Sequence, residues 1–158
     1  MGPIRSALTA APCTLAVAGV LVLGGCGSTD DDVPAACFGT PASLLSTLGQ
    51  APPVRLEDAT PLSDCVSAAR TDGDLQSLGL LFVRVADVLR GQAGSDSEAA
   101  FSLGYLSGAV TRGSAKSSGS IAAQLARRVD QVATLDPGAD AASTEALARG
   151  KRAGARGG

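Results

Sequence analysis

Four cysteines carry most of the chemistry that the residue types of this chain allow: Cys13, Cys26, Cys37 and Cys65. A thiol can be acylated, bind a metal, act as a nucleophile or form a disulfide, and its surroundings decide among these reactions. Cys37 and Cys65 lie too far apart in the sequence to form a CxxC redox motif. Because two cysteines without histidine also make a poor zinc site, we expect no metal and favour a structural role for this pair.

Two pairs of carboxylates are the other residues whose spacing suggests chemistry, since the chain contains no histidine. The absence of histidine excludes Ser-His-Asp and Cys-His catalysis and haem with a histidine axial ligand. Glu57 with Asp58, and Asp72 with Asp74, would suit a hydrolase if burial separated their pKa values. Each pair lies beside Pro, Gly or an expected helix start, which favours exposed capping carboxylates. We therefore expect no catalytic residue and no cofactor.

The charge balance argues against nucleic-acid partners. The 13 Lys and Arg residues are outnumbered by 15 Asp and Glu, which gives a formal charge of −2. Non-specific nucleic-acid binding needs a large basic surface, and stacking on bases needs aromatic side chains. The chain has no Trp, one Tyr and three Phe. Its 158 residues allow one domain rather than two.

The N-terminus combines a basic start, an apolar run and a cysteine. Arg5 precedes an apolar run from Ala7 to Leu23, and Leu23-Gly24-Gly25-Cys26 ends it. Over residues 1–26 this sequence resembles the signal peptide and lipobox of bacterial lipoproteins. The resemblance implies that residues 1–25 are removed and that Cys26 receives acyl chains such as palmitate. Two or more chains anchor a protein at a membrane, here the cell membrane on its extracytoplasmic side.

Three alternatives to this interpretation of the N-terminus remain open at the sequence level. The apolar run could be an uncleaved anchor, although about 17 residues including Pro12 is short for a bilayer. It could also be a signal peptide that is cut elsewhere, or part of a cytoplasmic chain. Cys13 lies inside the run and would be removed with the leader.

The residues after Cys26 are small and acidic, and we expect a flexible tether over residues 26–34. Asp30, Asp31 and Asp32 are adjacent, without the alternating spacing and closing Glu of a calcium loop. If Cys26 is lipidated, Cys37 and Cys65 remain as a natural disulfide pair in an exported domain, where such bonds persist. The alternative is two buried free thiols.

The periodicity of the remaining chain predicts an all-α fold, a small bundle of about four helices over residues 35–136. Thr40-Pro41 and Thr60-Pro61 each predict the start of a short helix. A longer helix from residue 75 is apolar nearly all the way round, which is typical of a central position. We expect a flexible loop over residues 113–120. Residues 137–158 are expected to form a short helix or a disordered, basic, Gly-rich tail.

Small residues recur every four positions in the helix that we expect to start at a capping box of Ser95 and Glu98: Ala100, Gly104 and Gly108. Glycine inside a helix costs about 1 kcal/mol relative to alanine, so two on one face indicate that another backbone approaches there. We favour tight packing within the domain. The alternative is a groove for a ligand or for a helix of a partner protein.

The functional prediction is a non-catalytic lipoprotein of the cell envelope, a helical module that is anchored through lipid on Cys26 and binds another envelope component. An alternative is a carrier of a small apolar ligand between the helices, with the Gly104 and Gly108 face as one wall. Such a carrier needs a cavity, and a filled core at that face would remove it.

Overall fold

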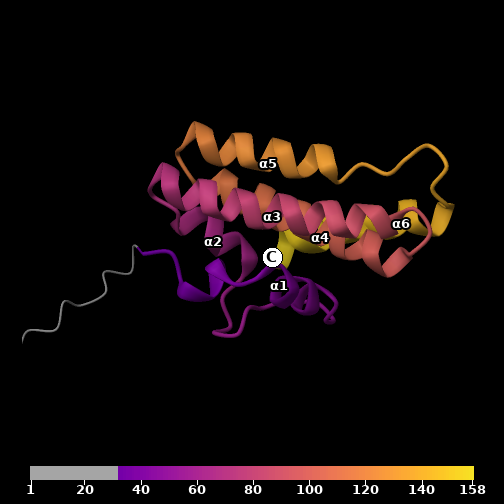
Figure 1. Cartoon of the computed structure of the whole chain (residues 1–158), viewed down its shortest axis with the longest axis horizontal. Helices are drawn as coiled ribbons and strands as arrows, with labels where there is room; N and C mark the ends of the chain where they lie inside the picture. Colours follow the sequence, from indigo (N-terminus) through magenta and orange to yellow (C-terminus); the bar gives the residue numbers. More distant parts are fainter. Residues whose placement is uncertain (1–31) are drawn as a thin grey trace, which may run out of the picture.

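The computed structural model describes residues 32–158, in which local capping signals divide the chain into helices (Figure 1). After a 3-10 helix, η1 (Ala35–Phe38), these residues form α1 (Pro41–Leu48), α2 (Leu62–Ala68), α3 (Asp72–Ala93), α4 (Ser97–Lys116), α5 (Ser120–Val132) and α6 (Ala141–Gly157). The described part of the chain has no strand, only an isolated bridge between Arg55 and Pro61. The all-α prediction is confirmed, with six α-helices instead of about four.

Side chains with short polar groups begin most of these helices. The Thr40 hydroxyl accepts a hydrogen bond from the Ser43 amide at 3.1 Å, and Pro41 supplies the preset backbone of the first turn. Thr71 and Asp74 bond reciprocally across the first turn of α3. Asp96 and Asp140 accept amide hydrogen bonds in the first turns of α4 and α6. The predicted start at Thr40-Pro41 is confirmed, whereas α2 begins after Pro61 without a side-chain cap and α3 begins at Asp72, three residues before the predicted start.

The buried helix of the bundle is α4, which contacts α1, α2, α3, α5 and α6. More than half of its residues are buried. We expected the helix from residue 75 to be central, and this was wrong for α3. Leu80 on α3 is 76% exposed and Val88 is 43% exposed. The apolar stripe of α3 is wide, but neighbouring helices cover only the side that carries Leu78, Phe82 and Val85.

Two polar side chains fix the N-terminal segments to α4. The Tyr105 hydroxyl accepts a hydrogen bond from the Val54 amide at 3.1 Å, and the Ser102 hydroxyl donates to the Leu48 carbonyl at 3.0 Å. All four groups are buried, so these bonds satisfy backbone atoms that would otherwise lose their contact with water. The long connection between α1 and α2 is therefore held to the core at Val54, and Leu56 is also buried, while most of its other residues are exposed.

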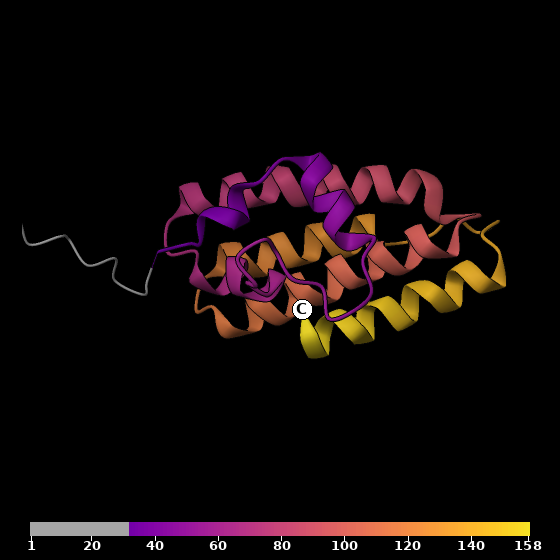
Figure 2. The same cartoon turned by 90° about the horizontal axis from the view of Figure 1, so that it is seen from below.

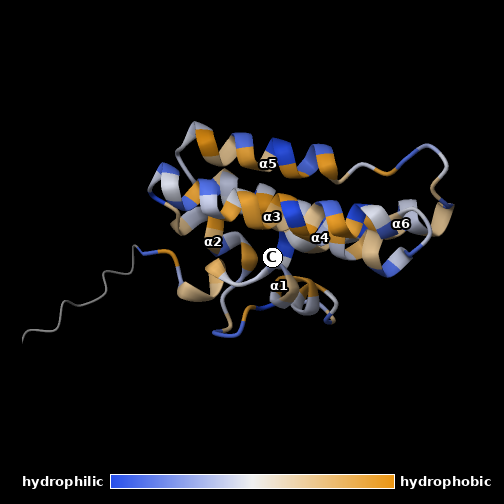
Figure 3. Cartoon of the chain, viewed as in Figure 1, coloured by the Kyte–Doolittle hydropathy of each residue, from blue (hydrophilic) through white to orange (hydrophobic). Residues whose placement is uncertain are grey.

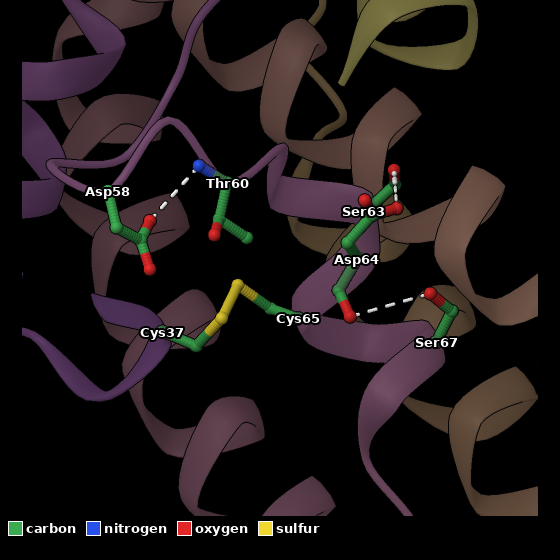
Figure 4. Close-up of a disulfide and its surroundings, with 7 residues drawn as sticks. All are labelled: Cys37, Asp58, Thr60, Ser63, Asp64, Cys65 and Ser67. Atoms are coloured by element: carbon green, nitrogen blue, oxygen red, sulfur yellow. Dashed lines mark hydrogen bonds between the residues drawn. A yellow bond between two sulfur atoms is a disulfide. The ribbon is translucent and has the colours of Figure 1, made fainter. Parts of the chain in front are cut away.

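The disulfide between Cys37 and Cys65 is present and joins η1 to the buried side of α2. The two Cα atoms are 5.5 Å apart, and both residues are almost fully buried. This confirms the predicted pairing. Figure 4 shows the bond between the end of η1 and the middle of α2, with Asp58 and Thr60 of the preceding loop nearby.

The end of the chain differs from the prediction of a short helix or a disordered tail. Residues 141–157 form α6, which lies along α4 and is part of the domain, so the packed domain extends beyond residue 136 (Figure 2). Ala146, Gly150 and Gly154 are buried. The expected loop at 113–120 is also shorter, because α4 continues to Lys116. Gly113 lies against α2, where an added Cβ would meet the Ser63 carbonyl oxygen at 2.3 Å.

Figure 3 shows alternating hydrophobic and hydrophilic bands along α5, as expected of a helix with one buried face. Between residues 32 and 158, no helix is both long and apolar enough to cross a membrane. The leader and Cys26 lie outside the described residues. Of the expected tether, Val33 packs partly against the core and Pro34 is half-buried, so the domain begins at its last residues.

We predict that replacing both Cys37 and Cys65 by alanine lowers the free energy of unfolding by about 2 to 4 kcal/mol. The bond closes a loop with a sequence separation of 28 and so restricts the unfolded chain. Urea unfolding with and without reductant measures this, and the double variant is its own control because reductant should not affect it. A wild-type transition that reductant leaves unchanged would contradict the prediction.

Candidate functional site

The glycine face of α4 contacts the backbone of α6. A Cβ atom added to Gly104 would lie 2.2 Å from the Leu147 carbonyl oxygen, and one added to Gly108 would lie 2.2 Å from that of Lys151. Both distances are far below any real van der Waals contact, so only glycine fits at these positions. Ala100, the third residue of the predicted stripe, is fully buried. Of the two expectations, the structure supports tight packing within the domain.

The contact is reciprocal, because α6 carries the same spacing of glycines. A Cβ on Gly150 would lie 2.1 Å from the Phe101 carbonyl oxygen, and one on Gly154 would lie 2.1 Å from that of Tyr105. Gly150 and Gly154 were not predicted from the sequence as part of this interface. The signal that could have revealed it is the separation of four positions between Gly150 and Gly154, which matches Gly104 and Gly108.

The order of these contacts shows that α4 and α6 run parallel. Gly104 lies beside Leu147 and Lys151, and Gly108 beside Lys151 and Ala155, so both helices advance in the same direction. The α5 helix and the residues 133–140 return the chain to the start of α4. There, the Asp140 amide donates to the Gly94 carbonyl at 3.2 Å.

Asp130 on α5 connects three helices. Its Oδ1 atom accepts a hydrogen bond from the Ser107 hydroxyl of α4 at 2.9 Å and from the Lys151 ammonium of α6 at 2.7 Å. The bond from Lys151 lowers the pKa of Asp130 from its ordinary value, burial opposes this, and the bond from Ser107 adds to the lowering. The Asp130 side chain is 55% exposed. The cluster joins α4, α5 and α6 through one carboxylate oxygen, which suits a structural link.

Two arginines and a serine bind the last turn of α6. Arg112 donates to the carbonyl oxygens of Ala155 and Arg156, and Arg55 donates to that of Gly157 at 2.9 Å. The buried Ser63 hydroxyl donates to the Gly158 carbonyl. Cationic donors at the C-terminal end of a helix also complement its dipole. The basic, Gly-rich end is therefore held by α2, α4 and the α1–α2 connection.

One residue of each carboxylate pair caps a turn. Asp58 accepts a hydrogen bond from the Thr60 amide at 3.0 Å, within a turn that includes Ala59 at a positive φ of 66°. Asp74 accepts from the Thr71 amide at 3.2 Å. Hydrogen bonds from Thr60 and Thr71 lower the pKa values of Asp58 and Asp74, respectively. The lowered pKa values favour the ionised carboxylates, which accept the capping hydrogen bonds.

A hollow of about 710 Å³ lies over the disulfide, between η1, α1 and the loop before α2. Its floor includes Leu44, Leu62 and Phe82, and Glu57 and Asp58 lie on its wall. A second, wider hollow of about 1090 Å³ lies on α3 and α5, beside the exposed Leu80. Within residues 32–158, no three Cys, Asp or Glu side chains come together in a way that would hold a metal ion.

Comparison of the chain with protein-family models, curated proteins and solved structures finds no match.

We predict that Gly104→Ala lowers the free energy of unfolding by about 1 to 3 kcal/mol, because the new methyl group would overlap the α6 backbone. Gly104→Leu should lower the free energy of unfolding by at least as much. Gly91→Ala is the matched control: Gly91 lies on the exposed side of α3 with nothing within 4 Å of an added Cβ. Gly91→Ala should raise the free energy of unfolding by about 0.5 to 1 kcal/mol, because alanine has the higher helix propensity. A thermal midpoint of Gly104→Ala at or above wild type would refute the packing assignment.

We predict that Asp130→Asn lowers stability at neutral pH by no more than about 1 kcal/mol, since the ion pair is partly exposed and screened. The folded-state pKa of Asp130 is lowered, so its contribution is complete above the unfolded pKa and is lost as pH falls through the folded pKa. Urea unfolding of both proteins at pH 7 and pH 2 measures the difference. Asp87→Asn makes the same charge change on the exposed side of α3 and should leave stability nearly unchanged. An Asp130→Asn deficit that persists in acid would contradict the prediction.

Proposed function

We propose that this protein is a membrane-anchored extracytoplasmic lipoprotein that acts as a non-catalytic binding or structural module of the cell envelope. The observation that carries the proposal is the Cys37–Cys65 disulfide. Structural disulfides form and persist in exported proteins and are rare in the cytoplasm. With this pair engaged, Cys26 is left for acylation in the sequence Leu23-Gly24-Gly25-Cys26.

The non-catalytic part of the proposal is supported by the roles of the carboxylates. Asp58 and Asp74 cap turns, and Asp130 pairs with Lys151. A general acid at neutral pH needs a raised pKa, whereas the pKa values of these three groups are lowered. The groups are therefore suited to holding local structure.

The structure argues against one version of the alternative function, a carrier that binds its ligand at the glycine face of α4. The Gly104 and Gly108 face contacts α6 and leaves no space for a ligand there. A carrier would have to use another place, such as the hollow over the disulfide or the one on α3 and α5. For the module itself, we propose a protein partner in the envelope, which crosslinking and pulldown of the lipidated protein from intact envelopes would identify.

We predict that the mature protein begins at Cys26 and carries acyl chains there. Mass spectrometry of the protein purified from membranes measures both features. Cys26→Ala should leave an unprocessed or a released form, because no thiol is present to accept the lipid. Cys13→Ala is the matched control within the leader and should leave lipidation unchanged. An unmodified Cys26 inside a longer chain would refute the anchoring proposal.

A further inference from the structure

The hollow on α3 and α5 follows the line where these two helices meet. Its lining residues repeat at helical spacing, and an added Cβ on Gly79 of α3 would lie 3.5 Å from the Leu125 side chain of α5. The helices are therefore in contact at the bottom of the hollow. Gly39 and Pro41, which follow η1, form part of its rim on the other side of α3.

Several apolar side chains of this hollow are open to solvent. Leu80 is 76% exposed, and Leu81, Val83 and Ile121 are partly exposed. Phe38, which directly precedes the rim residue Gly39, is 45% exposed. One exposed leucine is ordinary on a protein surface, whereas several apolar side chains around one hollow indicate a surface that something covers. Covering them would remove apolar area from water, which is favourable.

Two arginines in the same hollow have no carboxylate partner. Arg84 and Arg128 are exposed, and neither forms an ion pair with a carboxylate of the described residues. Among the described residues that line the hollow, Asp87 is the one acidic side chain. The lining is therefore net positive, although the formal charge of the chain is −2. A surface that complements it in charge is anionic.

The proposed anchor limits the distance between the domain and a membrane. The described part of the chain begins at Asp32, six residues after Cys26. Six residues span at most about 20 Å. The first element after this point is η1, which contacts α3 and leads directly into the rim of the hollow at Gly39. The rim therefore belongs to the segment of the domain that is nearest to the anchor along the chain.

We propose that the hollow on α3 and α5 lies against anionic lipid headgroups of the membrane that anchors the protein. Leu80 and its partly exposed neighbours reach the boundary between headgroups and acyl chains. Arg84 and Arg128 donate to lipid phosphate oxygens, a geometry that guanidinium groups favour. A second copy docked face to face would instead place these arginines opposite each other. The inference rests on the proposed anchor at Cys26, which brings the domain to the lipid surface.

The chain contains no tryptophan, so Leu80→Trp places a single fluorescent reporter in this hollow. The protein purified from membranes is reconstituted into vesicles of phosphatidylcholine alone, or of equal parts phosphatidylcholine and phosphatidylglycerol. Lipids brominated on their acyl chains quench an indole that reaches them. We expect strong quenching of Leu80→Trp in the phosphatidylglycerol mixture, weak quenching in phosphatidylcholine, and a loss of this difference at high salt.

Ala148→Trp is the matched control for the affinity of the indole itself for lipid. Ala148 is exposed on α6, which lies across the bundle from α3 (Figure 2). A tryptophan there faces away from the membrane in the proposed orientation. Its fluorescence should be the same in both kinds of vesicle.

Replacing one arginine in the Leu80→Trp protein measures the contribution of charge. Either Arg84→Gln or Arg128→Gln should lower the ratio of lipid-bound to free orientations about fivefold, because each arginine at an anionic surface contributes by about that factor. Arg149→Gln makes the same charge change on the exposed side of α6 and should leave the ratio unchanged. All three arginines are exposed, and thermal melts in detergent check that each variant folds.

Equal quenching of Leu80→Trp in the two kinds of vesicle, or equal quenching of Leu80→Trp and Ala148→Trp, would overturn the proposal. So would an effect of Arg149→Gln as large as that of Arg84→Gln, because net charge alone would then explain the binding. Absence of quenching at Leu80→Trp would also overturn it and would leave the hollow to a protein partner.

The anchor is measured separately by flotation of the protein with vesicles of phosphatidylcholine alone. Protein that does not float with them contradicts the proposed anchor. In that case, titration of Leu80→Trp with the phosphatidylglycerol mixture still measures whether the hollow binds anionic lipid. Failure of the anchor and failure of the lipid-facing hollow therefore give different results.

Discussion

The close approach of the α4 and α6 backbones is the constraint on which the remaining packing depends. Gly104 and Gly108 meet Gly150 and Gly154 along two parallel helices, and each glycine lies against a carbonyl of the opposite helix. Four helical glycines cost conformational entropy. Dispersion contacts between two backbones along their shared length offset this cost, since close packing multiplies many small attractions. Because α4 also contacts α2, α3 and α5, its position relative to α6 sets the position of the bundle.

The composition of the core explains why this constraint and the disulfide occur together. Buried Leu, Val and Ala residues dominate the core, and Tyr105 and Phe82 are the large aromatic side chains within it. Small side chains remove less apolar area from water than aromatic ones, so the hydrophobic contribution per residue is modest. The bond between Cys37 and Cys65 restricts the unfolded chain, and the Asp130 cluster ties α4, α5 and α6 at one point. Both stabilise a core that has little apolar area.

Local signals could be read from the sequence, whereas contacts between distant segments could not. Thr40-Pro41 begins α1 as predicted, because a capping hydroxyl and a preset proline act within one turn. The pairing of Cys37 with Cys65 followed from the count of cysteines and the expectation that the chain is exported. The glycine face on α4 was recognised, but its partner α6 was expected to be short or disordered. Hydrophobic periodicity does not detect α6, since it packs through its backbone and has few apolar side chains beyond Leu147.

The same contrast between local signals and distant contacts applies to the candidate sites. Glu57 and Asp58 were considered for catalysis, and nothing in their spacing shows that η1 and α1 form a hollow beside them. That hollow exists because the disulfide holds η1 close to α2 and because Ser102 and Tyr105 of α4 bind the segments on either side of residue 50. The sequence contains the groups that line the hollow, but their meeting depends on three segments that are distant along the chain.

The parallel pairing of α4 with α6 also affects the order in which parts of the chain fold. A chain that has emerged only as far as α5 has completed α4, yet Gly104 and Gly108 still face water, because their partner backbone lies more than 40 residues further on. The interface that orders the bundle therefore closes late, and contacts between distant residues slow folding. Until α6 has been added, the bundle lacks the most extensive contact of its buried helix α4.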